Sequence, residues 1–354
     1  MAARVMILAG GTGGHVYPAL AVAQELIARG CEVSWMGTRG GLEARVVPAA
    51  GIAIEWLSVS GFRGKGWAGR IAAPVRLMLA CVQAGRILRR FRPDVVLGMG
   101  GFAAAPGGIM ARLMGLPLVV HEQNRVPGTT NRILIKWARK VLEAFPGSFP
   151  ERVGAVGVGN PLRRDIVAAV DLIRPPHEVP VRLLIVGGSQ GAQVLNGVVP
   201  EVLAQVGEKL AVLHQTGAAT QTETEARYRE LGLEVRVQAF IEDMAEAYRW
   251  ADLAICRAGA MTISELTAMG VPAVLVPYPY AIDDHQTQNA HVMTDAGAAV
   301  LLPQSELNPT VLTAVLRDLL VPGRLAEMSG KARALARVDA TRTVADICLR
   351  EAAR

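Results

Sequence analysis

The stretch VMILAGGTGGH, residues 5–15, joins a short apolar run to a glycine-rich turn, and VRLLIVGGSQGA, residues 181–192, repeats the pattern half a chain later. Each stretch is typical of a buried strand that leads through a phosphate-sized turn into a helix. Glycine lets backbone N–H groups approach a phosphate closely, and the following helix adds a partial positive charge. Two such units predict two α/β domains that face a ligand-binding cleft.

The bulk composition agrees with a folded chain that meets an anionic partner. Its 354 residues suffice for two cores, and 51% are hydrophobic, which excludes a disordered protein. The formal net charge of +6 suits nucleic acid, acidic lipid or a phosphorylated metabolite. The four cysteines form no C-x-x-C pair, and no apolar run reaches the roughly 18 residues of a spanning helix. Any membrane contact is therefore expected to be peripheral.

Strand and helix patterns alternate along the whole chain, which predicts doubly wound parallel sheets covered on both faces. Proline favours the first turn of a helix, so the first helix is expected to start at Pro18. The sequence Gly159-Asn160-Pro161 is a natural hinge. We therefore expect a first domain at residues 1–160 and a second at 161–339, with a last helix at about 340–354 that packs back on the first domain.

Two common nucleotide-binding classes are excluded by the turns themselves. A dinucleotide fingerprint that starts at Gly11 and Gly13 meets Val16 where its third glycine belongs. The second strand runs into Thr38 and Arg39 and offers no acidic residue for a ribose. Neither turn carries the Gly-Lys-Ser/Thr of a P-loop.

Four polar positions are candidates for chemistry, each with a plainer alternative. His15 enters the first helix, where its imidazole can take a proton from a sugar hydroxyl or can simply pack. Glu265 lies in a helix start after a strand, where it can accept both hydroxyls of a ribose or merely favour the helix. Asn124 ends another strand and is expected on the same side of the predicted cleft as His15. Arg163, after the hinge, is either a phosphate partner or solvated surface.

Eight motifs, in order along nearly the whole chain, resemble those of the MurG family of bacterial glycosyltransferases. They are GGTGGH, GMGG, HEQN, GNPLR, GGSQGA, FIEDM, CRAGAMTISE and DDHQTQNA. The resemblance implies the GT-B fold and an inverting transfer of GlcNAc from UDP-GlcNAc to the 4-hydroxyl of MurNAc. The implied acceptor is lipid I, undecaprenyl-pyrophosphoryl-MurNAc-pentapeptide, and the implied product is lipid II.

The resemblance also implies roles for particular residues. His15 matches the family's proposed base, and Glu265 the group that holds the ribose. The expected UDP-GlcNAc contacts are Thr12, Gly13, Gly14, Asn124, Arg163, Ser189, Ile241, Ala260, Met261, Thr262, Ile263, Ser264, Glu265 and Gln286. Met261 stands where leucine is frequent, and the second loop reads GMGGFAAAPGG, with alanines where many relatives are more polar. No cofactor and no metal are expected.

The implied partners are UDP-GlcNAc, lipid I and an anionic membrane surface, with no nucleic acid. The implied location is the cytoplasmic face of the bacterial inner membrane, with the first domain binding acceptor and membrane and the second binding UDP-GlcNAc. Residues that mix aromatic, aliphatic and basic side chains form the expected docking face: 62–67, Arg70, Ile71, Val75, Leu77, Met78 and Leu79, extended by Lys136, Trp137, Arg139 and Lys140. A core-facing amphipathic helix is the alternative.

Other functions fit the same architecture. A UDP-GlcNAc 2-epimerase or a diacylglycerol glycosyltransferase would use a similar donor site. From a different class, a non-catalytic UDP-sugar sensor would keep the fold without turnover. The presence of both His15 and Glu265 favours an enzyme.

Overall fold

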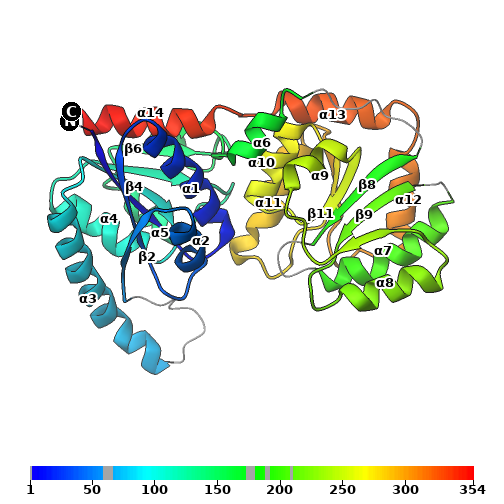
Figure 1. The fold of residues 1–354 in the computed structure, drawn as a ribbon, viewed down its shortest axis with the longest axis horizontal. Helices are drawn as coiled ribbons and strands as arrows, with labels where there is room; N and C mark the ends of the chain where they lie inside the picture. Colours follow the sequence, from blue (N-terminus) through cyan, green and yellow to red (C-terminus); the bar gives the residue numbers. More distant parts are fainter. Residues whose placement is uncertain (1, 59–66, 173–179, 188–191, 208–209) are drawn as a thin grey trace. The chain divides into compact units, whose positions relative to one another are not determined.

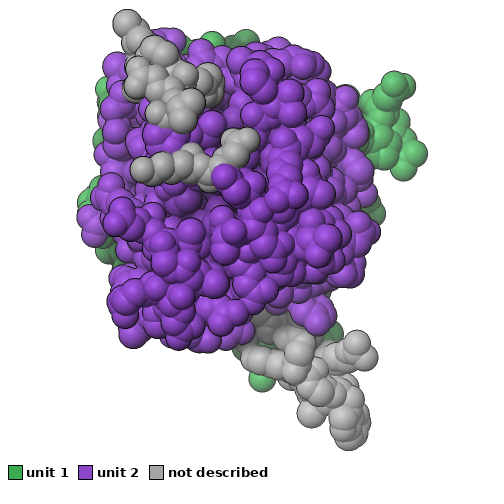
Figure 2. Space-filling view, turned by 90° about the vertical axis from the view of Figure 1, so that its right-hand side faces the viewer, with its two compact units in different colours: residues 1–163, 337–354 green, residues 164–336 purple. Residues whose placement is uncertain are grey.

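The computed structural model describes residues 2–58, 67–172, 180–187, 192–207 and 210–354, and the backbone alone of residues 67–73. It separates into two compact units, which Figure 2 colours differently. Unit 1 comprises Met1–Arg163 and Arg337–Arg354, and unit 2 comprises Arg164–Ala336. The hinge was predicted after residue 160, so the predicted and structural boundaries lie close together. The binding roles of the two units stay predictions.

Unit 1 is built on a parallel sheet of seven strands in the order β3-β2-β1-β4-β5-β6-β7. The strands are β1 Arg4–Ala9, β2 Glu32–Gly37, β3 Ala53–Trp56, β4 Val95–Gly100, β5 Leu118–Glu122, β6 Lys140–Glu143 and β7 Val156–Gly157. The helices are α1 Gly13–Ala28, α2 Glu43–Ala49, α3 Trp67–Phe91, α4 Ala104–Leu113, α5 Thr129–Leu134, the short 3-10 turn Glu151–Val153 and the last helix, α14 Ala340–Ala352.

Both faces of the central strands β1, β4 and β5 are buried, as their nearly continuous apolar sequences require. Residues of α3 and α4 pack on one face, among them Ala84 and Leu88. Residues of α1 and α14 pack on the other, among them Val22 and Val344. The chain's last helix therefore belongs to unit 1, as Figure 1 shows in red.

Unit 2 repeats the plan with six parallel strands in the order β10-β9-β8-β11-β12-β13. The strands are β8 Val181–Val186, β9 Leu210–Gln215, β10 Arg236–Gln238, β11 Leu253–Cys256, β12 Ala273–Leu275 and β13 Ala299–Leu301. The helices are α6 Arg164–Ala169, α7 Gln193–Val206, α8 Gln221–Glu230, α9 Met244–Trp250, α10 Ala260–Met269, the 3-10 turn Ile282–Asp284, α11 His285–Thr294, α12 Pro309–Leu319 and α13 Arg324–Ala334.

The prediction of two doubly wound α/β units is thus confirmed. In each sheet the strand order reverses beside the strand that leads into a glycine turn, at β1 next to β4 and at β8 next to β11. Ligands of such sheets bind outside the carboxyl ends of the strands at these switch points. The carboxyl ends of β1 and β8, which lead into the two glycine-rich stretches of the sequence, therefore lie at the expected binding edge of their units.

One helix boundary differs from the prediction. α1 begins at Gly13, and Pro18 lies inside it. Thr12 is extended, with φ −99° and ψ 163°, and its carbonyl already accepts the N–H groups of His15 and Val16. The helix therefore starts as soon as the turn ends, and Pro18 forgoes one internal hydrogen bond. As a consequence His15 lies in the first turn of α1.

Candidate functional site

The first glycine turn presents the start of α1 at the carboxyl end of β1. Thr12 is exposed, and Gly13 and Gly14 are partly exposed. The first N–H groups of a helix have no partner within it, and the helix dipole makes them attractive to anions. The three predicted donor contacts of this turn therefore lie at a helix start, where an anion is favoured, and their binding of the donor stays a prediction.

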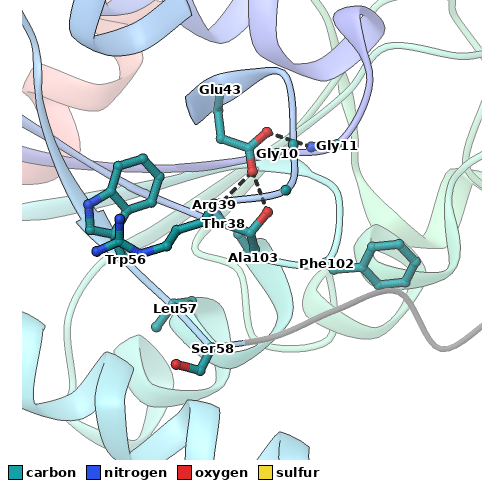
Figure 3. A pocket seen from close by; sticks show the side chains of 12 residues that line it. Gly10, Gly11, Thr38, Arg39, Glu43, Trp56, Leu57, Ser58, Phe102 and Ala103 are labelled. Atoms are coloured by element: carbon teal, nitrogen blue, oxygen red, sulfur yellow. Dashed lines mark hydrogen bonds between the residues drawn. The ribbon is translucent and has the colours of Figure 1, made fainter. Parts of the chain in front are cut away.

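The carboxylate of Glu43 fixes this turn through hydrogen bonds (Figure 3). It accepts hydrogen bonds from the backbone N–H of Gly11 at 2.9 Å, from the backbone N–H of Thr38 at 2.9 Å and from the Thr38 hydroxyl at 2.7 Å. Glu43 is fully buried, and a Cβ on Gly10 would approach its Oε1 to 2.6 Å. Glu43 thus ties the glycine turn to the end of β2.

Glu43 had no predicted role, because the acidic residue sought at the end of the second strand was one that would bind a ribose. The carboxylate comes instead from the first turn of α2. Beside it lies a cavity of about 470 Å³, lined by the glycine turn and by Arg39, Trp56, Ser58 and Phe102. In Figure 3 the Arg39 side chain lies over the Trp56 ring, with 4.9 Å between the guanidinium carbon and the ring centroid.

The glycine turn after β4 lies directly against the first one. Gly101 has φ +80°, and a Cβ there would come within 2.1 Å of the Gly10 carbonyl oxygen. Gly100 has φ +97°, and a Cβ there would come within 3.0 Å of the His15 ring. Both positions need glycine because backbone and ring approach so closely. The motif GMGG therefore shapes the surroundings of His15.

His15 is hydrogen-bonded on one side of its ring. Its Nδ1 lies 2.7 Å from Oε1 of Gln123, which follows β5 directly. The Gln123 Nε2 in turn lies 3.0 Å from Nδ1 of His121, and the His121 Nε2 lies 2.9 Å from the Gly159 carbonyl oxygen. His15 is part-buried, and the contact with Gln123 fixes the Nδ1 edge of its ring.

His121 stays neutral at physiological pH. It is fully buried, and this burial lowers the pKa of its imidazole to about 4, outweighing the raising effects of the Gly159 carbonyl and the Glu122 charge. Because the unfolded chain takes up this proton near the ordinary pKa of 6.5 and the folded chain only near 4, the buried His121 costs stability progressively as the pH falls from 6.5 to about 4. His121 is a structural partner in this series rather than a second base.

Glu122 organises the polar segment that follows β5. Its Oε1 accepts the backbone N–H groups of Gln123 and Asn124 and the Asn124 side chain, at 3.0–3.3 Å. Its Oε2 accepts Gly128 N at 3.0 Å and Asn131 Nδ2 at 2.8 Å. The predicted donor contact Asn124 is therefore held in one place by a buried carboxylate. No roles were predicted for Glu122 and Gln123 of the HEQN motif.

In unit 2, the segment after β11 begins α10 as predicted. Gly259 is the extended N-cap, with φ −65° and ψ 145°. Met261, Thr262 and Ser264 are partly exposed in the first turns, whereas Ala260 and Ile263 are buried and pack beneath them. The Ser264 hydroxyl donates to the Ala260 carbonyl at 3.0 Å.

Glu265 is held by a partner that the sequence argument missed. The hydroxyl of Tyr248, a buried residue of α9, donates to Oε2 of Glu265 at 3.2 Å. The Glu265 side chain is part-buried. Tyr248 therefore orients a carboxylate that remains accessible. No pattern along α9 marks the tyrosine in advance.

Gln286 is oriented by backbone donors. Its Oε1 accepts the N–H of Tyr278 at 2.9 Å and the N–H of Ala258 at 3.3 Å. Because the amide oxygen is engaged, the NH₂ group is the part that remains to serve a ligand. Gln286 can thus act as a hydrogen-bond donor to sugar hydroxyls.

The remaining predicted contacts are dispersed. Ser189 lies outside the described residues. Ile241 is buried in the loop between β10 and α9, and Arg163 is part-buried at the end of the first segment of unit 1. Within each unit the structure gathers the candidates: Thr12–His15 with Asn124's segment in unit 1, and residues 260–265 with Gln286 in unit 2. Among the described residues, no three His, Cys, Asp or Glu side chains gather as a metal site.

Two family models match the chain. The glycosyltransferase family 28 N-terminal domain matches residues 5–143, and the glycosyltransferase family 28 C-terminal domain matches residues 182–344. Together they span both units and both glycine turns.

Curated relatives match over nearly the full length. The chain is 61% identical to the UDP-N-acetylglucosamine--N-acetylmuramyl-(pentapeptide) pyrophosphoryl-undecaprenol N-acetylglucosamine transferase of Methylococcus capsulatus, with 99% of each sequence covered. It is 55% identical to the enzyme of the same name from Alkalilimnicola ehrlichii, covering 98% of this chain and 99% of the relative.

Solved structures agree. The crystal structure of Acinetobacter baumannii MurG matches with a TM-score of 0.86 and 41% identity, covering 98% of this chain and 99% of that one. The glycotransferase of kitacinnamycin matches with a TM-score of 0.74 and 19% identity, covering 99% of each chain, a likeness of fold alone.

Proposed function

Because the chain belongs to glycosyltransferase family 28 and, within it, to the MurG enzymes, we propose that it transfers N-acetylglucosamine from UDP-GlcNAc to the 4-hydroxyl of MurNAc in lipid I. The products are lipid II and UDP. The observation that carries this proposal is the 61% identity over 99% of both sequences to a transferase whose name states this donor and acceptor.

The reaction is a single displacement at the anomeric carbon of GlcNAc. The bond from C1 to the acceptor O4 forms, and the bond from C1 to the UDP oxygen breaks, with its electron pair leaving on UDP. The acceptor hydroxyl loses its proton, and we assign its acceptance to His15. The anionic leaving group is stabilised by helix-start amides, with Arg163 and the Ser189 turn as the proposed diphosphate partners.

Donor recognition is proposed for unit 2. Glu265, oriented by Tyr248, suits the two ribose hydroxyls. Gln286 suits the hydroxyls of GlcNAc because its NH₂ group is the part left to donate. Met261, Thr262 and Ser264 line the start of α10, supported by buried Ala260 and Ile263. Thr12, Gly13, Gly14, Asn124 and Ile241 complete the proposed set.

The decisive experiment follows radiolabel from UDP-GlcNAc. With lipid I present, we expect label to appear in the solvent-extracted lipid and UDP to be released in equal amount. Label transferred to diacylglycerol instead would identify a different lipid glycosyltransferase. Conversion of UDP-GlcNAc without lipid would identify an epimerase, and binding without turnover would identify a sensor.

We further propose that the protein docks on the membrane surface. Among the described residues, no helix is long and apolar enough to cross a bilayer. The α3 helix nevertheless exposes Val75, Met78, Leu79 and Val82, each by 46–61%, at the spacing of one helix face. Its opposite face packs in the core through Ala80, Ala84, Ile87 and Leu88. In Figure 1 the N-terminal half of α3 projects from the body of unit 1.

This exposed face supports a docking surface for an anionic leaflet, since Arg76 and Arg86 flank it on the same helix and are exposed. Trp137, Lys136 and Lys140 are also exposed, and Arg139 lies 3.7 Å from Glu351. The predicted residues 62–66, and the side chains of Trp67, Arg70 and Ile71, lie outside the described part of the chain.

We expect the double substitution Met78→Glu and Leu79→Glu to weaken binding to anionic vesicles at least about tenfold, since it removes apolar insertion and adds repulsion. Co-sedimentation measures this, with UDP-GlcNAc affinity unchanged. Val321→Glu, at a residue of unit 2 that is 56% exposed, is the matched control and should bind like the parent. Equal sedimentation of all three proteins would exclude α3 as the docking surface.

A further inference from the structure

Two side chains, His121 and Gln123, lie in series between a backbone carbonyl and His15. The Gly159 carbonyl faces Nε2 of His121, the His121 Nδ1 faces Nε2 of Gln123, and the Gln123 Oε1 faces Nδ1 of His15. His121 and Gln123 are fully buried, so water cannot substitute for either partner. Each contact is between 2.7 and 3.0 Å.

Two backbone carbonyls decide which atoms of this series carry hydrogen. A carbonyl oxygen only accepts hydrogen bonds, so the His121 Nε2 that faces Gly159 must be an N–H. One end of the Gln123 side-chain amide also lies 3.1 Å from the backbone carbonyl oxygen of His121, two residues earlier in the chain. The atom there must be the NH₂ group, which leaves the Gln123 oxygen toward His15.

The state of His15 then follows by elimination. A neutral His121 that carries its hydrogen on Nε2 has a bare Nδ1, which accepts the second N–H of Gln123. The Gln123 oxygen can only accept, so the Nδ1 of His15 must be its N–H. In a neutral His15 the remaining lone pair therefore resides on Nε2.

We propose that the Gly159 carbonyl, His121 and Gln123 form a relay that fixes the tautomer of His15, so that Nε2 is the atom that takes the acceptor proton. Its catalytic meaning rests on the proposed function, in which His15 is the base. His121 and Gln123 are positioning residues: they select a tautomer and an orientation through hydrogen bonds made on the far side of the ring.

The neighbouring groups allow this relay only one arrangement of hydrogen-bond donors and acceptors. The titratable groups that its contacts place next to Gln123 are His15 of α1 and His121 and Glu122 of β5. Glu122 is engaged by four neighbouring residues and His121 is buried and neutral, so neither can exchange roles with the amide. The His15 ring lies so close to Gly100 that a side chain at position 100 would crowd the ring.

The relay can be read directly by nitrogen NMR of ¹⁵N-histidine-labelled enzyme, because an N–H nitrogen and a bare ring nitrogen resonate far apart. The chain has six histidines, so the spectrum is tractable, and His15→Gln and His121→Asn assign the two signals. At a pH where His15 is neutral, we expect hydrogen on Nδ1 of His15 and on Nε2 of His121. Hydrogen on Nε2 of neutral His15 would overturn the proposal.

Kinetics add a second readout. Gln123→Leu removes all three contacts of the side-chain amide. We expect kcat to fall at least about tenfold, with an unchanged KM for UDP-GlcNAc, because His15 loses its fixed tautomer. The His15 signal should then shift from the single tautomer. The matched control is Tyr228→Phe, which removes a 2.8 Å partner from another buried histidine, His214, and should leave kcat and the His15 signal unchanged.

The two arms separate the relay from the proposed function. An unchanged His15 signal in a folded Gln123→Leu enzyme would exclude the relay, even if His15 remained essential for activity. The expected tautomers together with a fully active His15→Gln enzyme would retain the relay as structure and would remove His15 as the base.

Discussion

His15→Ala is expected to lower kcat by about 10²–10⁴-fold, the usual contribution of a positioned general base. The imidazole lies in the first turn of α1, with Nδ1 hydrogen-bonded to Gln123 and, in the proposed relay, the lone pair on Nε2. Since the loss concerns proton transfer in the transition state, the KM for UDP-GlcNAc should change little. Steady-state kinetics with saturating lipid I measure both constants.

His291→Ala provides the matched control, because it removes a partly exposed histidine that pairs with Asp295, the residue that caps the end of the same helix. That variant should keep its kcat. A near-parental kcat for His15→Ala would show that another group, or none, accepts the proton.

Glu265→Ala is expected to raise the KM for UDP-GlcNAc by about 10- to 100-fold, which corresponds to the roughly 1.5–3 kcal/mol of hydrogen bonds to a charged group. The reason is that a part-buried carboxylate, oriented by Tyr248, loses its bonds to the ribose hydroxyls. The kcat at saturating donor should fall far less. Donor titrations by kinetics and by calorimetry with UDP measure the effect.

Two further variants sharpen this test. Tyr248→Phe keeps the carboxylate but removes its 3.2 Å partner, so a smaller rise in KM is expected. Glu246→Ala removes an exposed carboxylate that pairs with Arg249 and should leave the donor affinity as it is. If folded Glu265→Ala binds UDP as the parent does, the ribose assignment is wrong.

The strand–turn–helix units could be predicted closely because their signals are local. The apolar run at 181–186 coincides with β8, and the run before Gly10 with β1. Even here the first helix start was misplaced, since an extended Thr12 starts α1 before Pro18 is reached. Propensity ranks proline favourably at a helix start, yet it does not state where the preceding turn ends.

The roles of individual side chains were harder to predict. No role was predicted for Glu43, which reaches Gly11 from the helix that follows the second strand. Tyr248 lies on a different helix from Glu265. Such pairings depend on how elements pack, and neither periodicity nor spacing carries that information.

The sequence by itself determined the two α/β units, the glycine turns at their binding edges and, through its motifs, the family, because each of these is written in contiguous residues. Only the tertiary structure decided how His15 is held. Its partner Gln123 is 108 residues away in the sequence. In the proposed relay, the position of the hydrogen on the His15 ring is set by the Gly159 carbonyl, acting through His121 and Gln123. Hydrogen-bond direction is a property of atoms that meet in space, so it emerges only when the sheet brings β5 beside the start of α1.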